Sequence, residues 1–374
     1  MKKFKFGHAC GAQWQEATEC CIHQLGHLNG ENLGFLYATD IMASELIDIV
    51  DYLKKYTSIK HWIGSIGVGV CGDVQEYFNV PAIALMVGEF PEHAFKVFHS
   101  SSQNIKTLSA LPQQWGEDKQ PLFGIVHGTP QDEHIATHVY QLSEYLGDSF
   151  LVGGLTSSRT EFLQVADEVI VQDELSGVIF SNNVEVITRL TQGCAIIGEN
   201  HEVTQCKNNV IMTLDNRPAL EVLQEEVGEY LPHNLTFVYN TIFAALPIIG
   251  SDRGDYFVRN IMNIDVEEGY IAIGDYVEKG RNIRFARRDA ETAHHDMLNM
   301  LNTVKKGLNG KKPCGALYHS CIGRGENLFG HNSQEIRTIH AALGDCPIIG
   351  FFGQGEISHQ HLYGYTGVLS VFVA

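Results

Sequence analysis

The sequence is short of basic residues, and this shortage limits its partners. Lysine and arginine number 26 against 44 aspartates and glutamates, so the formal net charge is −18. Binding to nucleic acid or to an anionic membrane depends on a surplus of lysine and arginine. We therefore expect neither nucleic acid nor a membrane surface as a constitutive partner.

Long apolar runs are also missing. No window approaches the ~18 uninterrupted apolar residues of a membrane span, and the N-terminus lacks the apolar run of roughly 7 to 15 residues that marks a signal peptide. The nine cysteines are scattered and form no Cys-x-x-Cys pair, which is typical of reduced thiols in a cytosolic protein. We expect a soluble cytoplasmic protein without membrane insertion. The missing Cys-x-x-Cys-His motif excludes covalently attached haem, but not haem held without a covalent bond.

The sequence does contain one block in three degenerate copies. Each copy reads as an apolar strand, a helix, a second strand that ends in a glycine-rich turn, and a third strand. The first-strand and second-strand glycines lie 30, 29 and 35 residues apart in the pairs Gly34 and Gly64, Gly124 and Gly153, and Gly315 and Gly350. This reuse predicts that the second-strand glycines are structurally equivalent. The variable turns should then lie at equivalent strand ends, where ligands bind.

These copies predict a mixed α/β fold, in which repeated strand-helix-strand-strand units form two sheet-based modules. A chain of 374 residues is too long for one ordinary core and suggests about two or three domains. We expect a helical lead-in over residues 1–30, an N-terminal module over 31–230 and a C-terminal module over 231–374. Alternating apolar and polar residues predict antiparallel hairpins in the second half, followed by a long helix over 289–308.

The turn after the first strand of the third copy is the strongest candidate for a binding loop. It begins with Ser320 and Cys321 and continues with Arg324 between two glycines, the second of which is Gly325. Such a loop offers backbone donors and a fixed cation to a carboxylate or a phosphate. We predict that these residues bind a small ligand.

The turn after the second strand of the same copy carries Gly353, Gly355 and Glu356. In a parallel arrangement the two turns meet at one sheet edge, so we predict that they face one cavity. A contact there between Glu356 and Arg324 would suit a structural ion pair as well as a binding site. The sequence leaves both interpretations open.

The same loop raises the alternative of an enzyme. Cys321 would be a nucleophile if His319 or Arg324 lowered the pKa of its thiol. No asparagine or aspartate partner is evident by spacing, so we expect a binding protein and not an enzyme. For metals, His23 and His27 have the i, i+4 spacing of two ligands. No third ligand is indicated, and we predict no metal site.

Two sets of motifs resemble the FIST family of sensory proteins over nearly the whole chain. The C-terminal set includes the Arg324 loop, and the N-terminal set includes the glycine-rich turns of the first two copies. The C-terminal motifs lie at residues 256–262, 265–271, 280–289, 320–330, 335, 347–357 and 365–369, and the N-terminal motifs at 33–39, 62–67, 152–157, 188–194 and 214–220. The resemblance implies a FIST N module followed by a FIST C module.

The resemblance also implies a ligand-sensing protein that acts in signal transduction. Family members occur alone, beside histidine kinases or fused to output domains, and small ligands such as amino acids have been suggested for them. A stand-alone subset, the NosP type, binds haem, senses nitric oxide and regulates a partner histidine kinase. This chain has no helical kinase core, so the resemblance implies regulation of a histidine kinase or another signalling protein in trans.

Haem b is therefore the expected cofactor, and nitric oxide the expected signal. The 18 histidines are a surplus for a protein of this size, which suits haem ligation as well as proton chemistry. The family motifs supply no haem ligand, so His319 and His361 are chosen from their positions. A sensor of amino acids without haem, and an enzyme that uses Cys321 and Arg324, stay open as alternatives. A homodimer and other oligomeric states stay open as well.

Overall fold

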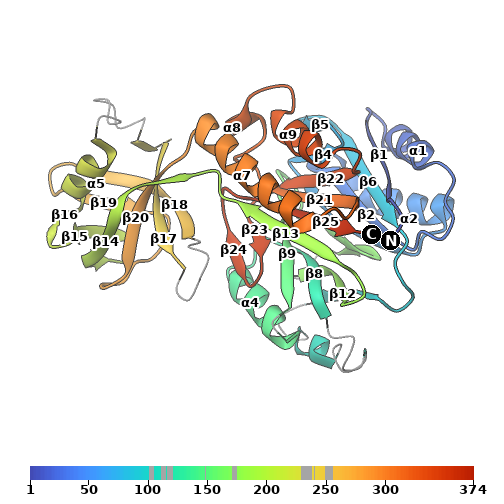
Figure 1. Cartoon of the computed structure of the whole chain (residues 1–374), viewed down its shortest axis with the longest axis horizontal. Coiled ribbons are helices and arrows are strands. Elements are labelled where there is room, and N and C mark those ends of the chain that lie inside the picture. Colours follow the sequence, from blue (N-terminus) through green and yellow to red (C-terminus); the bar gives the residue numbers. More distant parts are fainter. Residues whose placement is uncertain are drawn as a thin grey trace. The chain divides into compact units, whose positions relative to one another are not determined.

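The computed structural model (Figure 1) describes residues 1–100, 105–110, 115, 121–147, 149–170, 175–228, 238–239, 241–248 and 256–374. It confirms the predicted mixed α/β class, with four β-sheets in the described residues. The chain forms two compact units, one made of Met1–Thr191 with Leu298–Ala374 and the other of Gln192–Met297. The module boundary expected near residues 231–234 lies outside the described residues.

The three predicted copies form the sheets of the first unit, and they share one topology. In each copy the first strand pairs in parallel with the second strand and antiparallel with the third. The first copy holds β2 (Leu33–Thr39), α2 (Leu46–Thr57), β3 (His61–Gly67) and β6 (Ala82–Gly88); the second holds β8 (Pro121–Gly128), α4 (Ile135–Tyr145), β9 (Phe150–Leu155) and β12 (Leu175–Ser181); the third holds β21 (Pro313–Cys321), α9 (Gln334–Leu343), β22 (Ile348–Gly353) and β25 (Gly367–Val373). The predicted repeat is confirmed.

The second-strand glycines are equivalent, as predicted. Gly64, Gly153 and Gly350 each lie opposite a first-strand residue in the parallel register. A Cβ atom at any of the three would lie within 1.8 Å of that residue's carbonyl oxygen. Only glycine lets the two backbones approach so closely.

Each copy also has elements outside the repeated block, and of these only the helix in the lead-in and the long helix over 289–308 were predicted. A strand and a helix precede the first strand, and a hairpin follows the second strand. The leading elements are β1 (Lys5–Cys10) and α1 (Trp14–Leu25), β7 (Phe95–Ser100) and η2 (Ile105–Ala110), and β13 (Val186–Thr191) and α7 (Ala290–Leu308). The hairpins are β4 (Gly69–Gly72) with β5 (Gln75–Phe78), β10 (Gln164–Ala166) with β11 (Glu168–Ile170), and β23 (Glu356–Ser358) with β24 (His361–Tyr363). Residues 1–30 thus hold a strand and a helix of the first copy.

The hairpins exchange between copies in a cycle. β4 of the first copy pairs with β22 of the third, β23 of the third pairs with β9 of the second, and β10 of the second pairs with β3 of the first. The leading strand pairs with the third strand at the other edge. Three six-stranded sheets of equivalent order result: β1-β6-β2-β3-β10-β11, β7-β12-β8-β9-β23-β24 and β13-β25-β21-β22-β4-β5. No copy completes its sheet alone.

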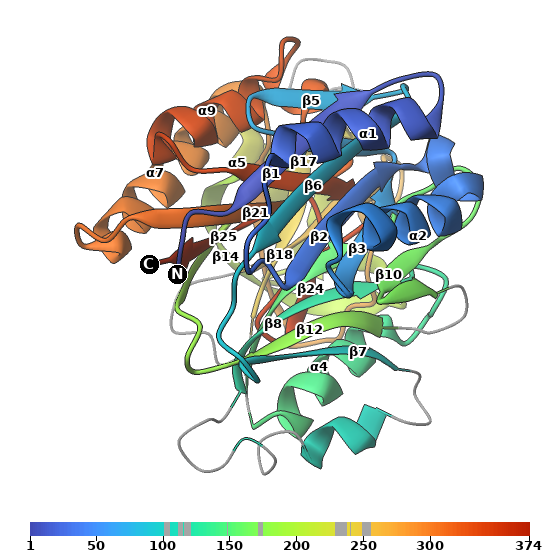
Figure 2. The same cartoon turned by 90° about the vertical axis from the view of Figure 1, so that its right-hand side faces the viewer.

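The three sheets share one apolar core. Side chains from all three, among them Phe35, Phe180 and Phe372, belong to a single buried cluster. α1 and α2 cover the outer face of the first sheet (Figure 2), and α4 with η2 covers the second. Strands covered on both faces are buried along their whole length, as β2 and β25 are. This is why their sequences are continuous apolar runs.

The second unit is a closed antiparallel barrel. Six strands pair in the order β14-β20-β17-β18-β19-β15, and β15 pairs back to β14. The unit holds β14 (Ala195–Lys207), β15 (Val210–Leu214), β16 (Arg217–Pro218), α5 (Ala219–Val227), β17 (Ile242–Pro247), β18 (Tyr256–Asp265), β19 (Tyr270–Ile273) and β20 (Asn282–Arg287). It confirms the antiparallel hairpins predicted in the second half. Along the chain it is an insertion into the third copy, between β13 and β21.

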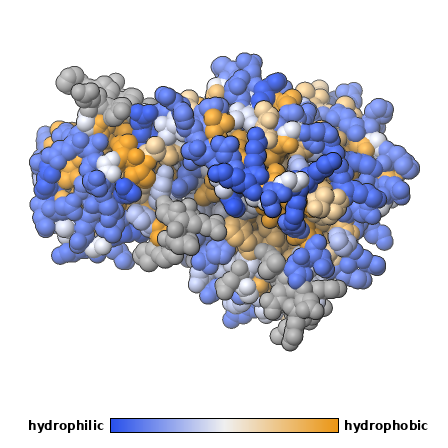
Figure 3. Space-filling view, in the orientation of Figure 1, coloured by the Kyte–Doolittle hydropathy of each residue, from blue (hydrophilic) through white to orange (hydrophobic). Residues whose placement is uncertain are grey.

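The surface of the protein is as polar as its composition predicts. The face shown in Figure 3 is mainly hydrophilic, as the acidic composition predicts. None of the helices in the described residues combines the length and the apolar character needed to cross a bilayer.

Candidate functional site

The predicted binding loop joins β21 to α8 (Glu326–Phe329) and is built around a buried ion pair. Arg324 and Glu335 are both 0% exposed, and the Arg324 Nε donates to Glu335 Oε1 over 2.7 Å. The hydroxyls of Tyr318 and Ser320 donate to the same oxygen, over 2.6 and 3.2 Å, and the backbone N–H of Gly325 donates to Oε2 over 2.6 Å. The carboxylate partner of Arg324 is therefore Glu335, from the first turn of α9, and not Glu356.

Glu356 begins β23 and is fully buried. Its Oε2 accepts the backbone N–H and the hydroxyl of Thr366, over 3.1 and 2.8 Å. Burial raises the pKa of this carboxyl to about 8, and the Thr366 hydrogen bonds, the charge of Arg324 and the Cys321 thiol lower it only in part. At neutral pH Glu356 is mainly protonated.

The two predicted turns do lie side by side. The N–H of Ile322 donates to the carbonyl of Gly353 over 2.9 Å, and the carbonyl of Gly355 accepts the N–H of Leu155 over 2.8 Å. A Cβ atom at Gly353 would lie 2.6 Å from the carbonyl oxygen of Leu155. The second turn is thus packed between its own copy and the end of β9, and its glycines are needed for close packing.

A cavity of about 470 Å³ adjoins the Arg324 loop. β5 forms its main wall, and Glu326, the first residue of α8, lines it as well. The lining residues are Cys10, Gln75, Glu76, Tyr77, Phe78, Asn79, Val80 and Glu326. Phe78 packs on Phe352, with ring centroids 4.5 Å apart, and a Cβ atom at Gly325 would lie 2.9 Å from the Phe78 ring. Gly325, with φ +54°, therefore places the loop directly behind the cavity wall.

Glu76 is the functional candidate that sequence analysis missed. It is 5% exposed, and its Oε1 accepts the N–H of Ile336 over 3.0 Å, which caps the N-terminus of α9. Its Oε2 is buried and has no hydrogen-bond partner in the described residues. Burial and the nearby Glu335 raise the pKa of Glu76 to about 8. A charged residue within the short segment after the first glycine-rich turn was the signal that could have identified it.

His319, proposed from its position as a haem ligand, lies where the three copies meet. It occupies the position one residue after the partner of Gly350, and Tyr37 and His127 occupy the equivalent positions of the first and second copies. All three side chains are buried. The Tyr37 hydroxyl lies 2.8 Å from Nε2 of His319 and 3.2 Å from Nε2 of His127. These three residues are called the axis cluster below.

The axis cluster holds two neutral imidazoles. Burial lowers the pKa of His319 to about 3 and the pKa of His127 well below its usual value. One hydroxyl proton can be donated to only one imidazole, so the two rings carry opposite tautomers. Each Nδ1 lacks a hydrogen-bond partner in the described residues.

Comparison with known protein families identifies the chain. The FIST N domain model matches residues 32–217, and the FIST C domain model matches residues 219–359. The chain belongs to the FIST family. FIST modules are sensory and signalling domains. Two relatives are uncharacterized mycobacterial proteins, one similar over nearly the whole chain and the other over about half of it. One, from Mycobacterium tuberculosis strain H37Rv, is 27% identical over 96% of both chains, and one, from Mycobacterium bovis, is 31% identical over 49% of this chain and 50% of the relative.

The two FIST segments do not coincide with the two spatial units. The FIST N match includes the first copy from β2 onward, the second copy, β13, and the barrel strands β14 and β15, and it ends at the first residue of β16. The FIST C match includes the other barrel strands and most of the third copy. Each segment therefore contributes strands to both units.

Haem ligation by His319 does not fit this FIST structure as packed. The side chain is 1% exposed, and its Nε2 already contacts the Tyr37 hydroxyl. The rings of Tyr37, His127 and Phe351 lie around it, with centroids 5.8, 6.0 and 5.6 Å away. His361 lies apart from the axis cluster, half-buried on the edge strand β24.

Cys321, the alternative nucleophile, is buried beside Glu356, and its thiol helps to lower the pKa of that carboxyl. A thiol that donates to a carboxyl keeps its proton, whereas nucleophilic attack requires the thiolate. His319, the base considered from the sequence, has its Nε2 engaged with Tyr37. The arrangement favours packing over nucleophilic chemistry at Cys321.

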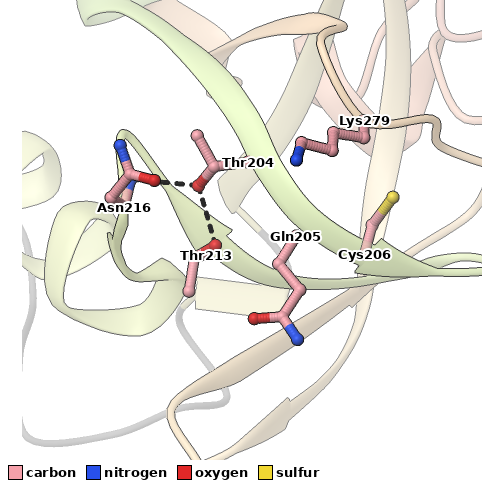
Figure 4. Close-up of a pocket in the computed structure, with 6 residues that line it drawn as sticks. All are labelled: Thr204, Gln205, Cys206, Thr213, Asn216 and Lys279. Atoms are coloured by element: carbon pink, nitrogen blue, oxygen red, sulfur yellow. Dashed lines mark hydrogen bonds between the residues drawn. The ribbon is translucent and has the colours of Figure 1, made fainter.

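A second cavity, of about 540 Å³, lies on the barrel (Figure 4). It is lined by Thr204, Gln205, Cys206, Thr213, Asn216 and Lys279. The Thr204 hydroxyl lies 2.7 Å from that of Thr213 and accepts the N–H of Asn216 over 2.9 Å. The lining side chains are exposed or half-buried, so this cavity is an open polar depression.

Proposed function

We propose that this FIST protein is a sensor that binds a small ligand in the cavity beside β5. The observation that carries the proposal is the carboxyl of Glu76, a lining residue of the cavity whose buried Oε2 has no hydrogen-bond partner in the described residues. Glu76 also caps α9, whose Glu335 holds Arg324. A ligand that draws Glu76 toward the cavity would change the cap of α9, and differential binding of this kind is what a sensor requires.

The first test is ligand-dependent thermal stabilisation of the full chain with a panel that includes amino acids. We expect Phe78→Leu, which reshapes the wall, to reduce the stabilisation by an active ligand. Glu16→Gln, an exposed change outside the cavity, is the control and should leave it unchanged. Stabilisation that is equal in Phe78→Leu and in the original protein would place the ligand elsewhere.

The output is proposed to be in trans, through a histidine kinase or another signalling protein. The proposal rests on the family, because the FIST N and FIST C segments over residues 32–359 are sensory and signalling modules. The test is autophosphorylation of a co-purifying kinase, measured with and without ligand. A kinase whose rate is the same in both conditions is not the partner.

Haem-based nitric oxide sensing is a second proposal, and it rests on the family resemblance and on His361. Bound haem would supply the iron that binds nitric oxide, and His361 on its edge strand is the accessible candidate ligand. Reconstitution with haem should give a Soret band that His361→Ala removes and His319→Ala keeps. A folded protein that stays colourless excludes haem and leaves the colourless ligand sensor.

A further inference from the structure

We propose that the cavity beside β5 recognises an organic ammonium ion. The inference rests on the proposed function, because it assigns a ligand class to the same cavity. The lining contains two carboxyl groups, those of Glu76 and Glu326, and two aromatic rings, those of Tyr77 and Phe78. Carboxylates and aromatic faces are the groups that bind alkylammonium ions.

The carboxyl group of Glu76 keeps one oxygen that can accept a hydrogen bond from a ligand. Glu76 uses Oε1 to cap α9, and its Oε2 has no donor in the described residues. Glu326 lies close enough to raise the pKa of Glu76 and is itself exposed. An ammonium group donates up to three hydrogen bonds, so it can serve both carboxyl groups and relieve their repulsion. Because Oε2 is covered in this structure, the ligand must also draw Glu76 toward the cavity.

The aromatic rings are held in place independently of a ligand. The Tyr77 hydroxyl lies 2.7 Å from Nδ1 of His8, and Phe78 packs on Phe352. Rings fixed in this way lose little freedom when a cation approaches their faces. The amides of Gln75 and Asn79 complete the polar part of the wall.

An anionic ligand finds no equivalent support. The lining residues include no lysine, arginine or histidine. Arg324, behind the wall, is buried and paired with Glu335. Arg159, which donates to Asn79, is already bound to both oxygens of Asp40. A free carboxylate or phosphate would therefore find no cation in the lining and would be repelled by the carboxylate of Glu326.

Cys10 allows occupancy to be measured whatever the charge of the ligand. Its thiol is exposed and lines the cavity, while Cys20 is exposed outside the lining and Cys206 is partly exposed on the barrel. In the full chain with Cys20→Ser and Cys206→Ser, the rate of N-ethylmaleimide addition to Cys10 reports on the filling of the cavity. Mass spectrometry of the Cys10 peptide identifies the labelled site.

The probes are four molecules with the same four-carbon chain: butylammonium, 1,4-diaminobutane, 4-aminobutanoate and butanoate, at equal ionic strength. We expect the first two to slow the labelling of Cys10 at concentrations where butanoate has no effect. Glu76→Gln should weaken this protection about 10- to 100-fold, as expected for a buried charged hydrogen bond. Glu326→Gln should weaken it about 2- to 5-fold, because that carboxylate is partly exposed.

Glu16→Gln is the matched control and should leave the protection unchanged. Because Glu76 also caps α9, a melting curve establishes that Glu76→Gln is folded, and Glu326→Gln tests the inference without touching the cap. Equal protection by butanoate overturns the ammonium assignment and keeps the cavity as the site. A panel ligand that stabilises the protein without slowing Cys10 labelling overturns the cavity, and with it the proposed function.

Discussion

Removing the buried cation of the Arg324 loop should destabilise the first unit strongly. In Arg324→Met the carboxylate of Glu335, at 0% exposure, keeps its bonds from Tyr318, Ser320 and Gly325 but loses the charge of Arg324. Breaking a buried ion pair from one side lowers the free energy of unfolding by about 3–5 kcal/mol. Part of the packing on Phe329, 5.0 Å below the guanidinium, is lost as well.

The assay exploits the distribution of tryptophan. All three tryptophans, Trp14, Trp62 and Trp115, belong to the first unit, and the barrel has none. Tryptophan fluorescence in a urea titration therefore follows the unfolding of the first unit alone. The control is Lys311→Ala, which removes an exposed ion pair with Glu185 and should change the midpoint little.

A double variant separates the charge from the packing. Arg324→Met with Glu335→Gln leaves no unpaired charge, so it should recover at least half of the free energy lost in Arg324→Met. The reasoning is refuted if Arg324→Met shifts the midpoint no more than Lys311→Ala does. It is also refuted if the double variant loses more free energy of unfolding than the two single variants lose together.

Three further predictions concern the repeat, the axis cluster and the buried acids. Gly350→Ala would place a Cβ atom 1.7 Å from the Tyr318 carbonyl oxygen and should prevent or severely weaken folding of the first unit. The control Gly307→Ala should be tolerated, because the nearest atom to its Cβ would lie 3.4 Å away. Equal expression levels and equal urea midpoints of the two variants would contradict this prediction. Tyr37→Phe removes the hydroxyl that meets both imidazoles and should lower the free energy of unfolding by about 1–3 kcal/mol, and an unchanged urea midpoint would count against the axis cluster. The pKa values of Glu76 and Glu356 are raised to about 8 from an ordinary 4.5, so between pH 4.5 and pH 8 the folded state binds more protons than the unfolded state. The stability that these two groups contribute is complete below pH 4.5 and is lost as the pH rises through 8. Glu356→Gln should therefore flatten the fall in the urea midpoint between pH 5 and 8, and an unaltered pH profile would show that the Glu356 carboxyl is already ionised.

The repeated topology could be predicted from the sequence because its signals are local. Apolar runs and glycines fix which segments pair in parallel, and the three second-strand glycines proved equivalent. The hairpin exchange could not be predicted, because strands of three or four residues carry no usable periodicity. The partner of β4 is moreover about 280 residues away, in β22.

The candidate site was predicted in part. Arg324 and the two turns were identified by residue type, but Glu335 and Glu356 are equally plausible partners until the position of α9 is known. The axis cluster was obscured by a one-residue difference in register. Counting from the first-strand glycine places Tyr318 where the structure has His319, and a slip of one residue moves a strand's side chains to the opposite face.

The cyclic exchange of hairpins has a consequence for biosynthesis. The first sheet is complete once residue 170 has been made, because its last two strands come from the second copy. The second sheet waits for β23 and β24, and the third for β21, β22 and β25, all near the C-terminus. During translation β9 presents an open edge and the β4–β5 hairpin has no β22 to join, while the whole barrel is still to be made. Open edges of this kind can pair with strands of other chains, so we expect incorrect strand pairing to be a hazard until the strands of the third copy have been made.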